Sequence, residues 1–462
     1  MSQIDGFVIT PKPAVHFGPG AIGELPGVVR AAAADQVVVV TDAALASAPV
    51  IETVLTVLAD AGLPARLFAG VHTRPTPGDV AAGAAAGADA VAAAATTAAA
   101  SASAAAVTAM LRPSAPLAGP HHPPAPLAAP SQPAAPLTTW PHPEPAAPLT
   151  TWPHPVPSEP AAPRVVLVAV GSGAPIDAAK GIALAAVDPR HGRDPGRDHD
   201  LAAPVALPIV AVPTTAGPGA ETSALGLVTD PADRHAVYVG NASTMPAAAI
   251  LDPELAAGLA PAVIAGSGLD ALTRALESYL SLRPNPWSDG IALQAIRMAA
   301  ASLPRAVMDG TDLAARSQLL LAAHMAGIAT ASTGLGLCHA IGHSLGTRWD
   351  IAHGAALAMV LPEVLRFDLP ARIERMADVA FALGVGDTHA DTWPNAQAAI
   401  GAVTALRDDV GLNKLMSDFG ITEADFAQIA ADVLADEALA STPRPPSEDD
   451  IRAILLAAAG ST

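Results

Sequence analysis

Three short runs of apolar residues constrain the fold of this chain more than any other feature of its sequence. They lie at residues 36–41 (Gln-Val-Val-Val-Val-Thr), 165–170 (Val-Val-Leu-Val-Ala-Val) and 209–212 (Ile-Val-Ala-Val). Strands that are buried on both faces have this continuous β-branched character, because helices cover both sides of a parallel sheet. Helical patterns alternate with these runs, at 49–62, 78–88 and 175–185. The alternation predicts a doubly wound α/β domain with a parallel sheet.

The second half of the chain follows a different pattern. Its apolar residues recur with helical periodicity at 262–282, 288–303, 311–333, 335–347 and 354–366, and further helix extends to about residue 460. No strand is needed there. We therefore expect residues 1–253 to form an α/β domain and residues 254–462 to form an all-helical domain. A cleft between two such domains is where a ligand is expected.

A proline-rich block interrupts the first half. Of the 46 prolines among 462 residues, 18 lie between Pro113 and Pro163, and an 11-residue unit that begins at Pro133 recurs from Pro145. Proline at this density prevents helices and strand ladders and favours extended segments. We interpret residues 91–163 as a disordered or polyproline insertion in the α/β domain. A docking motif for a proline-binding domain is the alternative.

Charge and cysteine content exclude several classes of protein. The chain has 24 basic and 43 acidic residues and a net charge of −19, which argues against binding nucleic acid or an anionic membrane. Its single cysteine, Cys338, excludes an intramolecular disulfide and a cysteine-based metal site, and fits a reducing compartment. There is no run of about 20 strongly apolar residues, and the first residues lack a leader pattern. We therefore expect a cytoplasmic protein.

Glycine-rich turns follow the predicted strands. Gly171, Ser172 and Gly173 come directly after the second apolar run and open a helix that contains Asp177. A strand, such a turn and a helix N-terminus together present backbone N–H groups to an anion. Thr214 and Thr215 follow the third run, and their hydroxyls can line a nucleotide.

A further glycine pattern lies near the start of the chain. The sequence from Gly18 to Gly23 matches G-x-G-x-x-G, and Asp42 lies 24 positions after Gly18, at the end of the next predicted strand. A lone match of this kind is weak. We interpret it as an ordinary turn, with phosphate binding as the alternative.

The second half contains a cluster of histidines and a buried acid. His339 and His343 are four residues apart and share one helix face, and His353 lies ten residues further on. Asp270 and Arg274 are also four residues apart, in an otherwise apolar helix. A buried carboxylate needs a cation or a metal as partner. One aspartate with two or three histidines suits a divalent metal ion.

Taken together, these motifs resemble those of the iron-containing (group III) alcohol dehydrogenase family, which includes a maleylacetate reductase-like branch. Several segments carry the resemblance, in order and at matching spacings: the turn at 171–180, the Thr-Thr-Ala-Gly segment at 214–221, Ile250–Pro253, Gly268–Ala271, His339–His343 and His353–Gly354. Without residues 91–163 the length is also typical of the family. The resemblance implies a dehydroquinate synthase-like architecture, with a dinucleotide-binding domain, a helical domain and a metal between them. It also implies a homodimer.

The family resemblance assigns roles to individual residues. It implies NAD(P)-linked interconversion of a small-molecule alcohol and an aldehyde or ketone. Asp42 matches the position that meets the adenosine ribose, and its carboxylate favours NAD over NADP. The pyrophosphate is expected at the turn of Gly171, Ser172 and Gly173, near Asp177, with Thr214 and Thr215 beside the nucleotide. The metal ligands carried over are Asp270, His339 and His353, for Fe²⁺ or Zn²⁺. His343 lies beside the nicotinamide in the family and is expected to relay protons.

The sequence departs from the family pattern at the metal site. Arg274 stands where the family has a fourth, histidine ligand. A guanidinium stays protonated and does not bind a metal, so Arg274 is expected to pair with Asp270 and to take a catalytic role. Ser172, Ala174, Pro218 and Ala220 are further departures in the cofactor loops. Two alternatives remain at this stage: a maleylacetate reductase-like enzyme, and a weakly active or inactive homologue that acts as a binding protein.

Overall fold

The computed structural model describes residues 13–92, 164–188, 205–230 and 235–460. Residues 1–94 and 163–462 form one compact unit, and all of the description below concerns that unit. The predicted insertion at 91–163 lies outside the described residues, apart from residues 91 and 92, which end a helix that spans residues 77–92.

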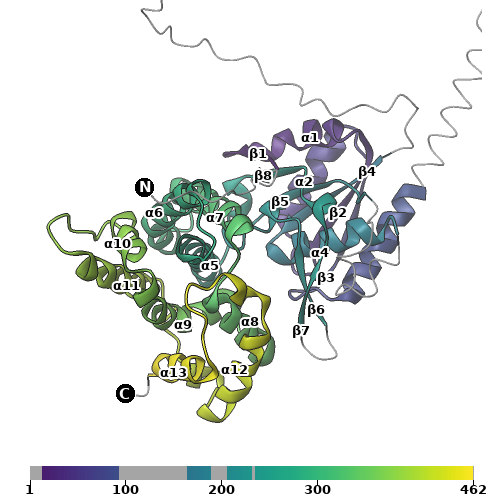
Figure 1. Cartoon of the computed structure of the whole chain (residues 1–462). Helices are drawn as coiled ribbons and strands as arrows, with labels where there is room; N and C mark the ends of the chain where they lie inside the picture. The colour runs from purple at the N-terminus through teal and green to yellow at the C-terminus, as the bar shows by residue number, and fades with distance from the viewer. Residues whose placement is uncertain (1–12, 93–163, 189–204, 231–234, 461–462) are drawn as a thin grey trace, which may run out of the picture. The chain divides into compact units, whose positions relative to one another are not determined.

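A six-stranded parallel sheet forms the core of the first half (Figure 1). Its strands, in spatial order, are β1 (Ala14–Phe17), β8 (Ala248–Leu251), β5 (Ile209–Pro213), β4 (Arg164–Gly171), β2 (Ala34–Asp42) and β3 (Ala65–Val71). The three apolar runs of the sequence are β2, β4 and β5, which are neighbours in the sheet. The parallel sheet predicted from those runs is therefore confirmed.

Helices cover both faces of this sheet. Alternate residues of β2 and β4 point to opposite sides, so Val37, Val39 and Val168 pack in one cluster with α1 (Leu25–Ala31) and α2 (Pro49–Asp60). The intervening residues of the same strands pack in a second cluster with α4 (Gly173–Ala185). Burial on both faces explains why these strands are continuous apolar runs rather than alternating ones.

The glycine pattern at residues 18–23 forms a turn at one edge of the sheet. Gly18 and Gly20 have positive φ angles of 134° and 76°, and the turn leads into the 3-10 helix η1 (Ala21–Glu24). The amide of Ile22 donates to a carboxylate oxygen of the buried Asp252 at 3.0 Å. Since β1 lies at the opposite edge from β2 and β3, this turn and Asp42 do not form one nucleotide-binding motif.

A small antiparallel hairpin completes the α/β half. It consists of β6 (Gly226–Asp230) and β7 (His235–Val239). Short 3-10 helices flank it: η4 (Ala220–Thr222), η5 (Ala242–Thr244) and η6 (Pro253–Ala256). The sequence did not predict this hairpin.

Residues 261–460 are helical, as expected, and no strand occurs among them. The α-helices are α5 (Pro261–Leu280), α6 (Pro286–Met308), α7 (Leu313–Thr333), α8 (Leu337–Trp349), α9 (His353–Asp368), α10 (Ile373–Ala382), α11 (Thr392–Asp409), α12 (Phe426–Ala435) and α13 (Glu448–Ala458). Short 3-10 helices lie between them: η7 (Leu369–Ala371), η8 (Met416–Phe419), η9 (Glu423–Asp425) and η10 (Glu437–Ser441). One continuous, alanine-rich hydrophobic cluster joins these helices.

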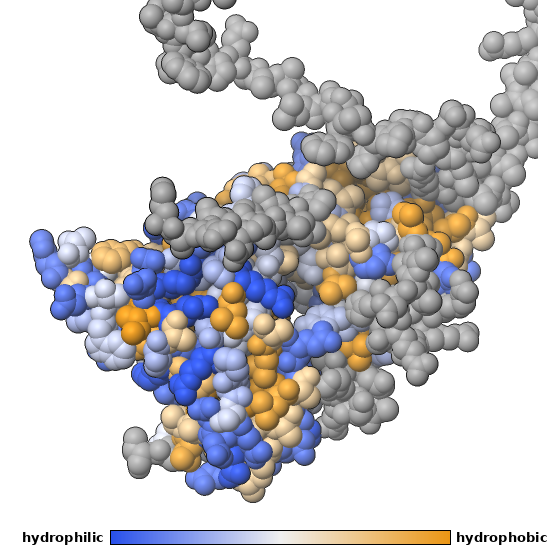
Figure 2. Space-filling view, viewed as in Figure 1, coloured by the Kyte–Doolittle hydropathy of each residue, from blue (hydrophilic) through white to orange (hydrophobic). Residues whose placement is uncertain are grey.

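The surface of the helical half is mixed in character. On the face shown in Figure 2, hydrophobic residues are interspersed with hydrophilic ones over these helices. Among the described helices, none is both long and apolar enough to cross a membrane alone; α7 and α8 would qualify only as a pair, across a bend of 107°.

Candidate active site

Asp270 is a buried carboxylate in the middle of α5. Only 3% of its surface is exposed. Nε of Arg274, one helical turn further on, donates to its Oδ1 atom at 2.8 Å. The ion pair expected from the spacing of these two residues is therefore present.

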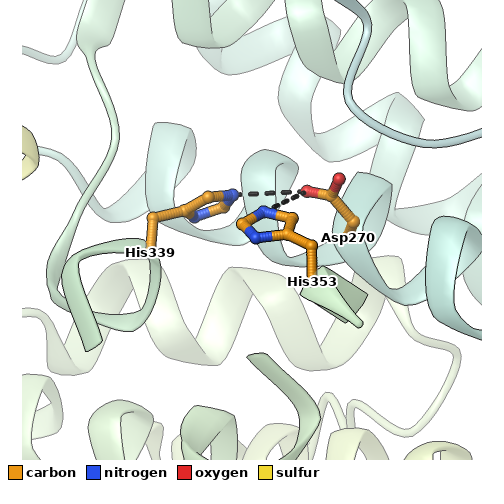
Figure 3. A group of neighbouring side chains, drawn as sticks. All are labelled: Asp270, His339 and His353. Atoms are coloured by element: carbon orange, nitrogen blue, oxygen red, sulfur yellow. Dashed lines mark hydrogen bonds and ion pairs between the residues drawn. The ribbon is translucent and has the colours of Figure 1, made fainter. Parts of the chain in front are cut away.

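His339 and His353 approach the same oxygen from two other helices (Figure 3). The Nε2 atoms of His339 on α8 and of His353 at the start of α9 lie 3.3 and 3.8 Å from Oδ1 of Asp270. A close contact between Gly266 on α5 and Gly354 on α9 lets His353 come near Asp270. A Cβ on Gly354 would come within 2.0 Å of the Gly266 carbonyl oxygen, so only glycine lets α9 begin this close to α5.

Glu277 holds His339 in place, and the sequence did not single it out for this role. Its carboxylate accepts the backbone amides of Gly336, Cys338 and His339 at 2.9, 2.8 and 3.2 Å, and so caps the start of α8 from α5. It also bonds Nδ1 of His339 at 2.5 Å. With Nδ1–H directed at Glu277, the Nε2 atom of His339 faces Asp270, an arrangement typical of metal-binding histidines. The only signal in the sequence is a second acid two turns after Asp270.

The environment fixes the charge of these groups. Burial raises the pKa of Asp270, but Arg274 and the two histidines outweigh it and hold that pKa well below its ordinary value. Burial also raises the pKa of Glu277, but the His339 ring outweighs burial and lowers that pKa. Burial lowers the pKa of His339, but Glu277 outweighs burial and raises that pKa. For His353 burial dominates and lowers its pKa to about 3, so this ring is neutral at pH 7.

Three of these residues fit a divalent metal ion. One ligand atom each from Asp270, His339 and His353 lies within 4.8 Å of the others. One carboxylate with two imidazoles is a common ligand set for iron and zinc. The fourth position holds the Arg274 guanidinium, which cannot be a ligand and repels a cation. The side chains thus offer three candidate ligands and one opposing charge.

His343 lies next to this group, one helical turn after His339. Its ring stacks on that of His353, with centroids 5.7 Å apart. Nδ1 of His343 lies 2.8 Å from Oδ2 of Asp436, and the backbone amide of Ala438 fixes the other oxygen of that carboxylate at 2.8 Å. This bond directs Nε2 of His343 away from Asp436. Asp436 was not predicted from the sequence.

Tyr238, on β7, lies near enough to Asp436 and Arg274 for their charges to act on its hydroxyl. Burial, followed by the charge of Asp436, raises its pKa to about 12, while Arg274 opposes the shift. Tyr238 therefore keeps its proton at neutral pH. Tyr238 was not predicted as a site residue.

The residues predicted to bind the cofactor meet at the carboxyl edge of the parallel sheet. Asp42 ends β2, Gly171 ends β4, and Thr214 follows β5, and these three strands are neighbours. The Thr214 amide donates to the Gly171 carbonyl at 2.8 Å. Ligands of open α/β sheets bind at this edge. The carboxylate of Asp42 accepts the amide of Leu45 at 2.9 Å.

The turn itself suits an anion. Gly171 has φ of 145°, and a Cβ there would come within 2.7 Å of Pro175, so the position requires glycine. Ser172 is the N-cap of the 13-residue α4, and its side chain makes no capping bond. The hydroxyl of Ser172 and the first amides of α4 are suited to bind a pyrophosphate. Thr215 is half-buried beside Thr214.

Asp177 lies one turn inside α4 and pairs with Lys180. Nζ of the fully buried Lys180 donates to Asp177 at 3.0 Å and to the carbonyls of Ala220 and Leu225 at 2.9 and 2.8 Å. The three N–H groups of the ammonium are thereby all used. The pair joins α4 to the segment after β5.

The chain matches the sequence models of one family of dehydrogenases. Residues 12–109 and 161–253 match the model of iron-containing alcohol dehydrogenase, and residues 264–459 match the C-terminal model of the same family. The EutG protein of Salmonella typhimurium, named as a probable alcohol dehydrogenase, is 40% identical over 294 residues, which are 64% of this chain and 72% of that protein. The 1,3-propanediol dehydrogenase of Klebsiella pneumoniae is 38% identical over 63% of this chain and 74% of its own.

Solved structures agree with the sequence comparisons. A crystal structure of 1,3-propanediol oxidoreductase is 29% identical, with a TM-score of 0.78 over 98% of this chain and all of that one. An alcohol dehydrogenase from Oenococcus oeni shares the fold, with a TM-score of 0.78 and 24% identity. The relatives do not favour the maleylacetate reductase-like and inactive alternatives. The chain therefore belongs to the iron-containing alcohol dehydrogenase family, as the resemblance of its motifs predicted.

Proposed function

We propose that this chain is an NAD(H)-dependent dehydrogenase of short aliphatic alcohols that relies on Arg274 in addition to, or in place of, a tightly held metal. The family relationship establishes the reaction class, which is interconversion of an alcohol and an aldehyde or ketone by hydride transfer. One observation carries the finer proposal: Arg274, His339 and His353 converge on the same oxygen of Asp270.

The preference for NAD over NADP rests on Asp42. Its position at the end of β2, beside the turn after β4, supports a contact with the adenosine ribose. The Leu45 amide fixes one carboxylate oxygen and leaves the other free to accept from a ribose hydroxyl. A negative charge there repels the 2′-phosphate of NADP.

Different residues of the site have different roles in the reaction. Bound NADH supplies the hydride, and a divalent ion held by Asp270, His339 and His353 would supply Lewis-acid polarisation of the carbonyl oxygen. Nε of Arg274 is bonded to Asp270, and no described residue accepts from its two terminal nitrogens. We infer that these nitrogens donate to the carbonyl oxygen and stabilise the negative charge that develops on it. His343 is held through Nδ1–H by Asp436, and in its imidazolium form it gives the oxygen the proton on Nε2, which solvent then replaces.

The substrate class follows from the relatives. Their names specify alcohols, 1,3-propanediol and methanol. We therefore propose short, uncharged primary alcohols and their aldehydes as substrates of this chain. The homodimer and the cytoplasmic location expected from the sequence stay predictions, as does the domain boundary at residue 253.

The test combines a substrate screen with metal analysis of the purified protein. Oxidation of NADH and of NADPH is followed with a series of aldehydes of increasing length, with maleylacetate as a comparison. We expect turnover of short aldehydes with NADH, and less than one equivalent of metal in the protein as isolated. Turnover of maleylacetate alone would contradict the proposed substrate class, and equal use of NADPH would contradict the role of Asp42.

A further inference from the structure

Residues 213–225, here called the bridging segment, contact the predicted pyrophosphate turn directly. The amide of Thr214 donates to the carbonyl of Gly171 at 2.8 Å. Pro218 packs against Gly173, where an added Cβ would come within 2.7 Å of the proline ring. The position of this segment therefore helps to set the shape of the turn.

The same segment contacts two helices of the helical half. A Cβ on Gly217 would lie 3.0 Å from the side chain of Ser267, which precedes Asp270 by three residues on α5. Gly219 has φ of 63°, and a Cβ there would come within 2.8 Å of Gly327 on α7. These close approaches place one short segment between the cofactor turn and the helix that carries Asp270.

A buried polar pair fastens the bridging segment to α7. Nδ1 of His324 lies 2.9 Å from Oε1 of Glu221, and the two residues are 2% and 3% exposed. Nε2 of His324 is buried and has no hydrogen-bond partner among the described residues. Glu221 is thus the polar contact that fixes this ring within the described part of the chain. Because the glycine contacts are not directional, the Glu221–His324 bond is the polar contact that sets the position of the segment on α7, while Lys180 ties Ala220 and Leu225 to α4.

We propose that Glu221 and His324 are positioning residues for the dinucleotide, acting through the bridging segment on the pyrophosphate turn. The inference rests on the cofactor site given under the proposed function. Without the bond, the bridging segment can shift on α7 and displace Thr214 and Pro218 from the turn. We expect the affinity for NAD(H) to decrease, rather than the rate of the chemical step, because neither residue belongs to the group around Asp270.

Four variants of the full-length protein test this inference: Glu221→Ala, His324→Ala, the double variant, and the conservative Glu221→Gln, which keeps an acceptor for Nδ1–H. Dissociation constants for NADH are measured by fluorescence, together with kcat, KM and thermal stability. Each alanine variant is expected to weaken NADH binding about tenfold, with kcat at saturating NADH changed less than KM. The double variant should match either single variant, because both remove the same contact. Glu221→Gln should keep most of the affinity that the alanine variants lose.

Thr333→Val is the matched control. Thr333 also lies on α7 and makes a buried bond, at 2.8 Å, to Ser278 on α5, and none of its described hydrogen bonds goes to the bridging segment. This variant should lower stability without changing the NADH dissociation constant. Unchanged NADH affinity in Glu221→Ala and His324→Ala, with only stability reduced, would overturn the inference. Failure of the unmodified protein to bind NADH would instead contradict the proposed function.

Discussion

Nε of Arg274 lies 2.8 Å from Oδ1 of Asp270, on the oxygen that Nε2 of His339 and Nε2 of His353 also face. The site therefore contains a fixed cation next to three residues that could hold a metal ion. Two unit charges 4 Å apart interact by about 4 kcal/mol at an effective dielectric constant of 20. Even a fraction of that repulsion weakens metal binding by an order of magnitude.

Replacing Arg274 by histidine should convert the site into a four-ligand metal centre. We expect Arg274→His to raise the affinity for Fe²⁺ or Zn²⁺ at least tenfold, because it removes a positive charge and adds an imidazole. Metal content after dialysis measures this directly, and Co²⁺ titration followed by visible absorbance reports the geometry. Arg297→His on the exposed face of α6 is the control. A tightly held stoichiometric metal in the unmodified protein, unaffected by Arg274→His, would show that Arg274 does not act on the metal.

Removing the charge of Asp42 should relax the choice of cofactor. Asp42→Gly deletes the carboxylate, whereas Asp42→Asn keeps an acceptor for the Leu45 amide and loses only the charge. Both variants should lower the preference for NADH over NADPH about tenfold, since the repulsion of the 2′-phosphate is lost. The ratio of kcat/KM for the two cofactors measures the change. An unmodified protein that used both cofactors equally would refute the placement of the ribose at Asp42.

The sequence predicted β2, β4 and β5 in the centre of the sheet and missed β3 and β8 for a physical reason. The inner parts of β2, β4 and β5 (residues 37–40, 165–170 and 209–212) are buried on both faces, so they are continuous apolar runs and the pattern is clear. β3 is half-exposed at the sheet edge, and β8 has only four residues in an alanine-rich stretch. Neither differs enough in composition from the neighbouring helices to be recognised.

The candidate site was predictable only in part. Asp270, His339 and His353 were found because their local spacing and the family motifs place them together. The partners of the histidines lie far along the chain: Glu277 is 62 residues from His339, and Asp436 is 93 residues from His343. A carboxylate of this kind becomes a partner only through tertiary packing, and a single sequence carries no signal for it.

The two tyrosines of the chain should resist ionisation in the folded protein. Burial and then Asp436 raise the pKa of Tyr238 to about 12, while burial and then the hydrogen bond to Asp378 raise the pKa of Tyr279. Because the folded pKa values exceed the unfolded value of about 10, the resulting stability is present below pH 10 and is lost as the pH rises from 10 towards 12. Tyrosinate absorbance should stay flat through pH 10 in the folded protein and rise near pH 10 in concentrated guanidinium chloride. A step near pH 10 in the folded protein, absent from Tyr238→Phe, would show that Tyr238 is not shielded.

The proline-rich block should be dispensable. The family models match residues 12–109 and 161–253 and skip residues 110–160. The entropy of closing a loop depends only logarithmically on its length, so shortening it changes stability by about 1 kcal/mol. We expect deletion of residues 110–160 to leave cooperative thermal unfolding and the NADH dissociation constant nearly unchanged. Aggregation of the deletion variant under conditions where the full chain stays dispersed would mean that the block contributes to the core.

Lys180 should be among the residues that contribute most to stability. Its ammonium is fully buried and donates to Asp177 and to the carbonyls of Ala220 and Leu225. Lys180→Met keeps most of the side-chain volume but leaves the Asp177 carboxylate and both carbonyls without this partner. Breaking a buried ion pair in this way costs about 3–5 kcal/mol. Denaturant unfolding should show a loss of this size, whereas Lys414→Met, at an exposed lysine, should change the free energy of unfolding by less than about 0.5 kcal/mol. Equal stability of the two variants would mean that water replaces the Lys180 contacts without cost, and that they do not hold the segment after β5.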